Sequence, residues 1–289
     1  MKIKKINFTK MTASGNDFIV IDNRRQNYNF NWEDIAPSIC NRRFGVGADG
    51  LIVLNKSSKA DFKMDYYNSD GSYGGMCGNG GRCSVFLYGC KTNLKKLKFE
   101  ALDFIYSAEL IRDNNIKLKM INPKSLKLNI QLHINKNKIK AHYIDTGSPH
   151  TIIFIDELPN SLRLDFQNGE INKIGSLIRY NEYFAPEGTN VDFVKVIDNE
   201  TIEIRTYERG VEDETLACGT GAIASSIISF YIKNISNKIN VRTKGGEILK
   251  VKFKNKSFNV YNVELIGNAK EVFKGIYYIR MPDNISYVK

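Results

Sequence analysis

Apolar and polar residues alternate along much of this chain in short runs rich in β-branched and aromatic side chains. The first half contains "DFIVID", "LIVLN", "FKMDYYN" and "IKLKMI". The second half contains "VDFVKVI", "TIEIRTY", "EILKVKF" and "NVYNVELI". Partial period-two alternation in runs of this length and composition predicts strands. We therefore expect a chain that is mostly sheet.

Fewer segments predict helices. "NWEDIAPSICNRR" begins at Asn31, a residue type favoured as a helix N-cap. The segments that follow Cys77 and Cys218 are the other candidates. After Cys218, four apolar residues keep the i, i+4, i+7, i+8 spacing of one buried helix face: Ile223, Ile227, Phe230 and Tyr231.

Short blocks of sequence recur in the same order. "TASGNDFIVID" (12–22) aligns without gaps with "TGSPHTIIFID" (146–156), and "GVGADGLIV" (45–53) aligns with "GTNVDFVKV" (188–196). These pairs are offset by 134 and 143 residues. Ordered repetition at a nearly constant offset indicates an internal duplication.

A third pair is built around two cysteines. Nine residues before Cys77 stands Asn68, and nine before Cys218 stands Arg209; each ends a strand-like run, at an offset of 141. The chain therefore predicts an α+β fold of two β-rich lobes, each with a central helix. The basic, Asn-rich stretch 122–142 is a plausible crossing between the lobes.

Composition narrows the class of protein. The 289 residues, 42% hydrophobic and 25% charged, suit two globular domains. The net charge of +11 comes from scattered lysines without a nucleic-acid-binding motif, so we expect no nucleic-acid partner. We find neither a signal peptide nor a run of apolar residues long enough to cross a membrane. Five cysteines, an odd number, favour reduced thiols in the cytoplasm over a disulfide framework.

The candidate chemistry lies in "MCGNGGRC" (76–83) and "ACGTGAIA" (217–224). In both, a cysteine directly precedes a glycine-rich turn into a predicted helix. Glycines let the backbone turn sharply and leave amide N–H groups uncovered. A helix N-terminus carries unpaired donors and partial positive charge, so it can hold a carboxylate. It also favours thiolate over thiol, and we expect a lowered thiol pKa.

Two related lobes that face each other would place one thiol on each side of a bound carboxylate, in the cleft between them. Stereoinversion requires this: one thiolate removes the α-proton, and the opposite thiol returns a proton to the other face. The helix N-termini would stabilise the developing negative charge. Each well-placed donor in such a site contributes about 3–4 kcal/mol, so several converging donors can stabilise this charge without a cofactor.

Other interpretations fit less well. The spacing of Cys77, Cys83 and Cys90 lacks the close pair usual in structural zinc sites, and no nearby histidine completes a set. "GTGAIA" matches a dinucleotide fingerprint, but nine residues separate it from the preceding strand. We interpret Cys40, Cys83 and Cys90 as structural, buried cysteines.

The chain resembles the diaminopimelate epimerase family from Met11 to about Gly275. The shared segments, in family order, are "GNDF", "GVGAD", "NSDGS", "CGNGGRC", "GSPH", "TN", "YERGVEDET" and "ACGTGA". Proline racemase-like relatives typically have histidine at the position of Asn79. The resemblance implies two lobes, each a β-barrel-like sheet around a central helix. It implies residues 1–120 with a returning tail 268–289 as one lobe, and 121–267 as the other.

The resemblance also implies an activity: conversion of LL-2,6-diaminopimelate to the meso form, for lysine and peptidoglycan precursors, without pyridoxal phosphate or metal. Cys77 and Cys218 match the acid/base pair. His150 and Glu208 match positions that tune the thiol pKa values. The remaining matches are positions that bind substrate: Asn16, Asn68, Gly78, Asn79, Ser148, Asn190, Glu208, Arg209, Gly219 and Thr220.

Two positions depart from the family pattern. Ser148 stands where many members have asparagine, and Gly50 where some have glutamine; both bear on substrate affinity. The alternatives are a racemase of another amino acid, a non-catalytic amino-acid-binding protein and a thiol redox protein. A binding protein would not need two thiols, and a redox protein would not need Arg209 and Glu208. The sequence leaves the oligomeric state open, with a homodimer as one option.

Overall fold

The computed structural model describes residues 2–163, 165–167 and 169–281 of the chain. They form two compact units. Among the described residues, the N-terminal unit comprises 2–118 and 267–281, and the C-terminal unit lies within 119–266. Of the predicted returning tail, residues 282–289 lie outside the described part.

The N-terminal unit is a sheet with two helices, α1 (Trp32–Cys40) and α2 (Gly78–Thr92). Its strands are β1 (Lys2–Ala13), β2 (Asn16–Asp22), β3 (Gly50–Asn55), β4 (Phe62–Asn68), β5 (Lys96–Ala101), β6 (Phe104–Leu110) and β17 (Lys270–Met281), with β7 (Asn115–Lys119) at its boundary. β17 pairs antiparallel with β1, and β1 with β2. Then β2 runs parallel to β3, β3 antiparallel to β4, β4 parallel to β5 and β5 antiparallel to β6.

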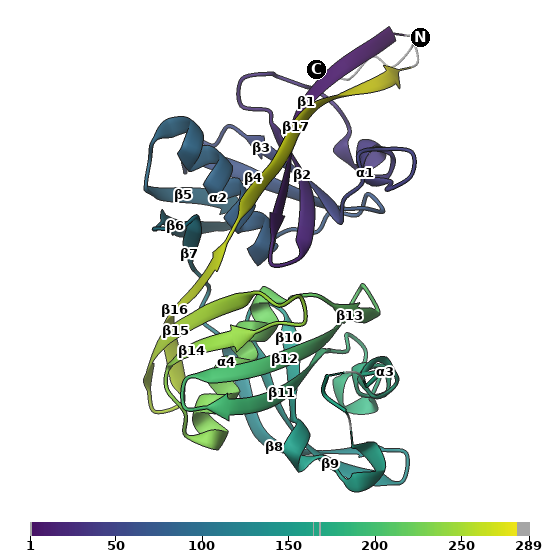
Figure 1. Ribbon diagram of the computed structural model, residues 1–289, viewed down its shortest axis with the longest axis vertical. Helices are drawn as coiled ribbons and strands as arrows, with labels where there is room; N and C mark the ends of the chain where they lie inside the picture. Colours follow the sequence, from purple (N-terminus) through teal and green to yellow (C-terminus); the bar gives the residue numbers. More distant parts are fainter. Residues whose placement is uncertain (1, 164, 168, 282–289) are drawn as a thin grey trace. The chain divides into compact units, whose positions relative to one another are not determined.

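The C-terminal unit repeats this order of strands (Figure 1). Its strands are β8 (Lys124–Ile134), β9 (Asn137–Asp145), β10 (Pro149–Phe154), β11 (Asn190–Asp198), β12 (Thr201–Glu208), β13 (Asp213–Thr215), β14 (Lys238–Arg242), β15 (Ile248–Lys256) and β16 (Asn259–Asn268). β8 pairs antiparallel with β9, and β9 with β10. Then β10 runs parallel to β11, β11 antiparallel to β12, β12 parallel to β14 and β14 antiparallel to β15. The same sequence of pairings in both units confirms the predicted α+β class and two similar lobes.

Parallel neighbours need a crossover connection, and in both units a helix supplies it. Helix α1 links β2 to β3, and α3 (Asn172–Arg179) links β10 to β11, flanked by the short 3₁₀ helices η1 (Ile155–Glu157), η2 (Asn160–Leu162) and η3 (Glu182–Phe184). The predicted start of α1 after Asn31 is confirmed. However, the Asn31 amide donates to the Asp34 carboxylate at 2.9 Å and does not cap the helix.

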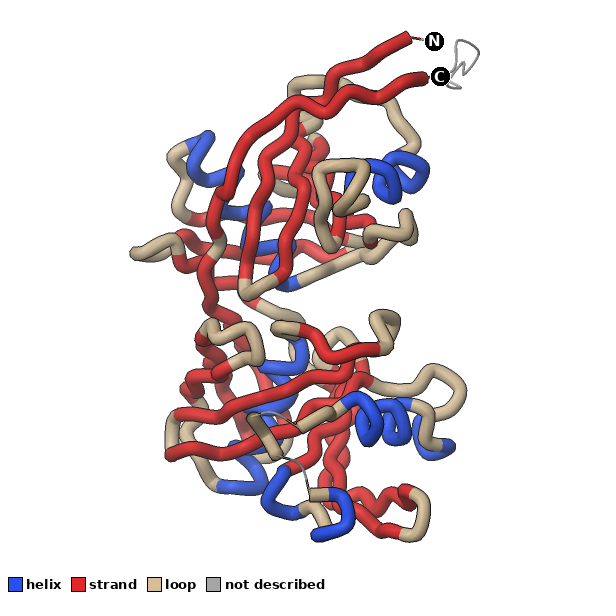
Figure 2. Tube along the Cα trace, turned by 45° about the vertical axis from the view of Figure 1, so that its right-hand side comes forward, coloured by secondary structure: helices blue, strands red, loops and turns tan. Residues whose placement is uncertain are grey.

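A central helix contacts the strands of each unit: α2 in the N-terminal unit and α4 (Gly219–Lys233) in the C-terminal unit. Figure 2 shows both helices against their strands. Both end at an asparagine in the left-handed conformation, Asn93 (φ 61°) and Asn234 (φ 53°), a common helix stop. The prediction that only one face of α4 is buried is wrong. The helix is buried on every side from Gly221 through Ser229, whereas Phe230 and Tyr231 are only half-buried.

The predicted crossing at 122–142 is wrong. This stretch forms most of the β8–β9 hairpin inside the C-terminal unit. Ile130, Leu132 and Ile134 alternate inward, and Ile139 and Ala141 follow on the partner strand, so the basic residues form the other face. Within the described residues, no helix is long and apolar enough to span a membrane.

Candidate active site

Each of the two candidate cysteines is the N-cap residue of a central helix. Cys77 precedes α2 with φ −119° and ψ 124°, and Cys218 precedes α4 with φ −118° and ψ 117°. The Cys77 sulfur accepts the N–H of Gly80 at 3.5 Å, and the Cys218 sulfur accepts that of Gly221 at 3.4 Å. The duplication has therefore placed two thiols in nearly the same backbone geometry.

The first amides of each helix precede its hydrogen-bonded ladder. The first intrahelical bonds are donated by Gly81 to Cys77 at 2.7 Å and by Ala222 to Cys218 at 2.9 Å. The preceding N–H groups have no acceptor four residues back along the helix. Those of Gly80 and Gly221 donate to sulfur, and the others belong to Gly78–Asn79 and to Gly219–Thr220, the residues predicted to hold a carboxylate. Each cysteine and the helix start that follows it form one half-site, which combines a sulfur with backbone donors suited to an anion.

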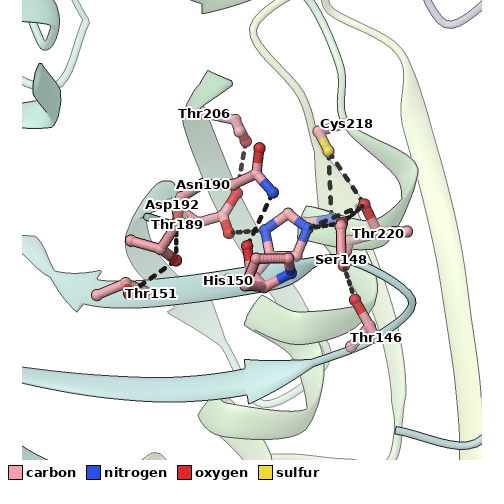
Figure 3. Close-up of polar contacts among 12 residues, drawn as sticks. Thr146, Ser148, His150, Thr151, Thr189, Asn190, Asp192, Thr206, Cys218 and Thr220 are labelled. Carbon is pink, nitrogen blue, oxygen red and sulfur yellow. Dashed lines mark hydrogen bonds and ion pairs between the residues drawn. The ribbon is translucent and has the colours of Figure 1, made fainter. Parts of the chain in front are cut away.

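In the C-terminal unit, a chain of polar contacts leads away from Cys218 (Figure 3). The Cys218 sulfur lies 3.4 Å from Thr220 Oγ1, which lies 2.9 Å from His150 Nε2. His150 Nδ1 lies 2.6 Å from Asp192 Oδ2. The hydroxyl of Thr206 donates to the other Asp192 oxygen at 2.6 Å. His150 and Asp192 are fully buried.

The N-terminal unit contains a matching chain. The Asn16 amide donates to Asp49 Oδ2 at 3.1 Å, and the Asn79 amide donates to Asn16 Oδ1. The buried guanidinium of Arg82 donates to Asn79 Oδ1 at 2.7 Å and to Ser14 Oγ at 2.8 Å. In the repeat alignment, Asp49, Asn16 and Asn79 occupy the positions of Asp192, His150 and Thr220. The two half-sites therefore share a framework built from different side chains.

The electrostatics around Cys218 differ from the prediction. Burial, followed by the charges of Glu208 and Asp192, raises the thiol pKa well above its ordinary value. Burial likewise raises the pKa of Glu208, the last residue of β12. The expectation that the helix N-terminus lowers the thiol pKa is wrong for Cys218, because desolvation and two nearby carboxyl groups outweigh the helix.

Arg209 lies at the edge of a cavity of about 410 Å³ in the C-terminal unit. Asn190 positions the backbone there: its Oδ1 accepts the Arg209 N–H at 2.8 Å, and its amide donates to the Pro149 carbonyl at 2.8 Å. The Arg209 guanidinium donates to the Glu187 carbonyl at 3.3 Å. Tyr143, Tyr183 and Lys127 also line the cavity.

A family profile described as diaminopimelate epimerase matches residues 8–120 and 142–270. The diaminopimelate epimerase of Chlorobaculum tepidum is 41% identical over 269 residues, covering 92% of this chain and 98% of that protein. The chain belongs to the diaminopimelate epimerase family. A second member, from Aquifex aeolicus, is 39% identical over 281 residues, covering 93% of this chain and 96% of that protein.

Solved structures with much lower sequence identity share the fold. A hydroxyproline epimerase from Agrobacterium vitis has a TM-score of 0.72 at 14% identity, covering 97% of this chain and 94% of that one. A phenazine biosynthesis protein of the PhzF family from Bacillus anthracis has a TM-score of 0.69 at 14% identity, covering 96% of this chain and all of that one.

Two local arrangements explain the departures from the family pattern. A Cβ at Gly50 would lie 2.4 Å from Tyr66 Cε2, so the tyrosine ring fills the space that a larger residue would need. The Tyr66 hydroxyl donates to Asn68 Oδ1 at 2.9 Å. Ser148 lies 3.0 Å from His150 Nε2 and donates to Thr220 Oγ1 at 3.1 Å. It therefore belongs to the chain of polar contacts that leads from Cys218 to Asp192.

The predicted residues fall into two groups, one in each unit. Asn79, two residues after Cys77, donates to Asn16, whereas Asn68 bonds to Tyr66 and Ser72 at the end of β4. In the C-terminal unit, Ser148, His150 and Thr220 lie beside Cys218.

Sequence reasoning missed Arg82 and the two aspartates, Asp49 and Asp192. The aspartates align in the duplicated blocks, and that signal could have identified them. The prediction that Cys90 is buried is wrong, because its side chain is exposed, whereas Cys40 and Cys83 are buried.

Proposed function

We propose that this protein is a cofactor-independent epimerase that converts LL-2,6-diaminopimelate to meso-diaminopimelate, a step toward lysine and peptidoglycan precursors. Membership of the family supports the substrate. The observation that carries the chemistry is the pair of equivalent turns, in which Cys77 and Cys218 cap helices of the same geometry. An inversion at carbon needs one such group for each face.

The proposed reaction requires both half-sites to reach the same α-carbon. One sulfur, as thiolate, takes the α-proton, and the other, as thiol, returns a proton to the opposite face. Burial and the nearby carboxyl groups keep Cys218 in its thiol form, so the resting enzyme carries a proton there. Cys77 is then the base that starts this half of the cycle.

The remaining residues bind the substrate. The amides of Gly78, Asn79, Gly219 and Thr220 hold the reacting carboxylate and stabilise charge that develops on it. Arg209 suits the distal carboxylate, because a guanidinium can bind both of its oxygens. Glu208 suits an ammonium group. Asn16, Asn68, Asn190 and Ser148 fix the polar groups around these positions.

The decisive experiment is turnover of LL-diaminopimelate in deuterated water. We expect meso product with deuterium at the inverted α-carbon, while early residual substrate remains protiated because the two thiols act from different faces. Cys77→Ala and Cys218→Ala should each abolish inversion and leave the circular dichroism spectrum unchanged. Full activity of Cys218→Ala would refute the two-base reaction. Comparable turnover of proline would instead indicate a racemase of another amino acid.

A further inference from the structure

Asp192 is fully buried on β11, where it contacts His150. We propose that Asp192 is a positioning residue that holds the hydrogen of the neutral His150 ring on Nδ1. The chain of hydrogen bonds from Cys218 through Thr220 to His150 then runs in the direction that keeps the sulfur protonated. Of the measurements that test this inference, only the kinetic one rests on the proposed function.

The donor and acceptor capacities of these side chains set the direction of the hydrogen bonds. A carboxylate can only accept, so the 2.6 Å contact with Asp192 requires a hydrogen on His150 Nδ1. Nε2 of the neutral ring is then an acceptor. It can receive the hydroxyl hydrogen of Thr220, 2.9 Å away, whose oxygen can in turn accept the S–H of Cys218 at 3.4 Å. Ser148, 3.0 Å from Nε2, donates its hydrogen to Thr220 Oγ1 at 3.1 Å and so leaves Nε2 to the Thr220 hydroxyl. Along the line from Cys218 through Thr220 and His150, donation therefore runs from sulfur toward Asp192.

The other tautomer would reverse this chain. With hydrogen on Nε2, the His150 ring would donate to Thr220, and the Thr220 hydroxyl would donate to the sulfur. Donation to sulfur favours thiolate, whereas donation from sulfur favours thiol. Asp192 therefore selects the arrangement that suits an acid. The raised pKa of Cys218, caused by burial, Glu208 and Asp192, agrees with this direction.

The N-terminal unit supports the argument independently. Arg82 can only donate, and it donates to Asn79 Oδ1 at 2.7 Å. The Asn79 amide must therefore face Asn16 as a donor, and the Asn16 amide donates to Asp49 at 3.1 Å. Donation again runs from the helix start toward the aspartate. The duplicated aspartate gives both chains the same polarity.

The carboxylate of Asp192 is also fixed in place. Thr206 of β12 donates to its Oδ1 at 2.6 Å, and its Oδ2 contacts His150 of β10. The first turn of α4 passes close by, because a Cβ at Gly221 would lie 2.4 Å from Oδ1. The titratable side chains that act on Cys218 are Asp192, Glu208 of β12 and, through Thr220, His150.

Nitrogen-15 NMR of the histidine rings tests the tautomer directly. The chain has three histidines, and His142 serves as an internal reference. Its Nδ1 accepts the Asn129 N–H at 3.2 Å, so His142 carries hydrogen on Nε2. We expect the opposite tautomer for His150 at pH 8, assigned with a His150→Gln variant. A wild-type His150 ring with hydrogen on Nε2, or on both nitrogens, would overturn the proposal.

Two variants test whether Asp192 is the cause. Asp192→Asn is isosteric, and Asp192→Ala removes every acceptor from Nδ1. We expect Nε2–H to appear at His150 in Asp192→Ala and to gain population in Asp192→Asn, while the His142 signals stay unchanged and report an intact fold. Retention of Nδ1–H in both variants refutes the role. Asp49→Asn, the matched change in the other unit, should not alter the His150 ring.

Thiol reactivity gives the second readout. The pH midpoint of Cys218 alkylation, followed on its own peptide by mass spectrometry, should fall in Asp192→Asn. A Thr220→Val background breaks the polar chain but keeps the charge, so the fall there should be smaller. An unchanged or higher midpoint would contradict the proposal. For activity, we expect kcat to fall roughly 10- to 100-fold with little change in KM, as for other residues that orient a reacting group.

Neither physical readout needs turnover. A negative deuterium-incorporation result with the expected His150 tautomer and Cys218 midpoint would reject the proposed function and leave the role of Asp192 standing.

Discussion

The glycines that follow the two cysteines offer a matched pair of substitutions with different expected costs. Gly80 and Gly221 both donate to the cysteine sulfur three residues earlier. A Cβ at Gly80 would lie 2.9 Å from Ile52 Cδ1, the end of a flexible side chain. A Cβ at Gly221 would lie 2.4 Å from Asp192 Oδ1, and this carboxylate is held by Thr206 at Oδ1 and by His150 at Oδ2.

The magnitudes follow from these neighbours. Overpacking a core typically costs about 1–3 kcal/mol, and alanine in place of glycine in a helix returns about 1 kcal/mol. Because the end of the Ile52 side chain can move, Gly80→Ala takes the low end of this cost, and it should change the free energy of unfolding by less than about 1 kcal/mol. At Gly221 the carboxylate must also give up a charge-assisted hydrogen bond, which contributes about 1.5–3 kcal/mol. Gly221→Ala should lower the free energy of unfolding by about 2–5 kcal/mol.

Urea unfolding measures both variants, with fluorescence and far-UV circular dichroism recorded together because the two units can unfold in separate steps. The loss in Gly221→Ala should appear in the transition of the C-terminal unit, and epimerase activity should fall with it. A Gly221→Ala protein as stable as Gly80→Ala would show that the Asp192 carboxylate can move freely, and the reasoning would fail.

Three further changes test other parts of the protein. Tyr66→Phe removes the hydroxyl that orients Asn68, so KM for LL-diaminopimelate should rise about 3- to 10-fold, the equivalent of one hydrogen bond, with kcat nearly constant; an unchanged KM would remove Asn68 from substrate binding. Arg209→Lys keeps the backbone bond to Asn190 but loses the guanidinium fork, so steady-state kinetics should show a KM at least about tenfold higher. Burial lowers the pKa of His142 to about 4, below its unfolded value of about 6.5, so stability should be full above pH 6.5 and decrease as the pH falls toward 4; thermal melts of His142→Gln should show a weaker dependence in that window if this histidine is responsible.

The strands and central helices could be predicted from the sequence because the patterns that indicate them are local. All eight predicted strand segments are strands, and both helices begin directly after Cys77 and Cys218. The β8–β9 hairpin was missed because lysines and asparagines mask its apolar alternation, which becomes clear only once the opposite face is known to pack. A strand's buried face depends on partners far away in the chain.

The chemistry of the site could likewise be predicted only where its sequence signals are local. Helix-start amides and thiols follow from motif and spacing, so the cysteines and their glycines could be assigned. The raised pKa of Cys218 could not, because it depends first on how deeply the fold buries the thiol and then on the nearby charges of Glu208 and Asp192. Arg82 was missed for the same reason: nothing in "CGNGGRC" shows that its guanidinium turns inward to Ser14 and Asn79.

The pairing of β1 with β17 has a consequence for synthesis. Lys2 lies opposite Met281 and Phe8 opposite Gly275, so the edge of the N-terminal unit stays unpaired until residues that follow the whole C-terminal unit have left the ribosome. The C-terminal unit, continuous from residue 119 to residue 266, is available to fold earlier. The nascent chain thus completes its second unit while the first still has an open strand edge, which invites pairing with other chains. The exposed Lys4 and Lys5 of β1 supply charge that discourages it.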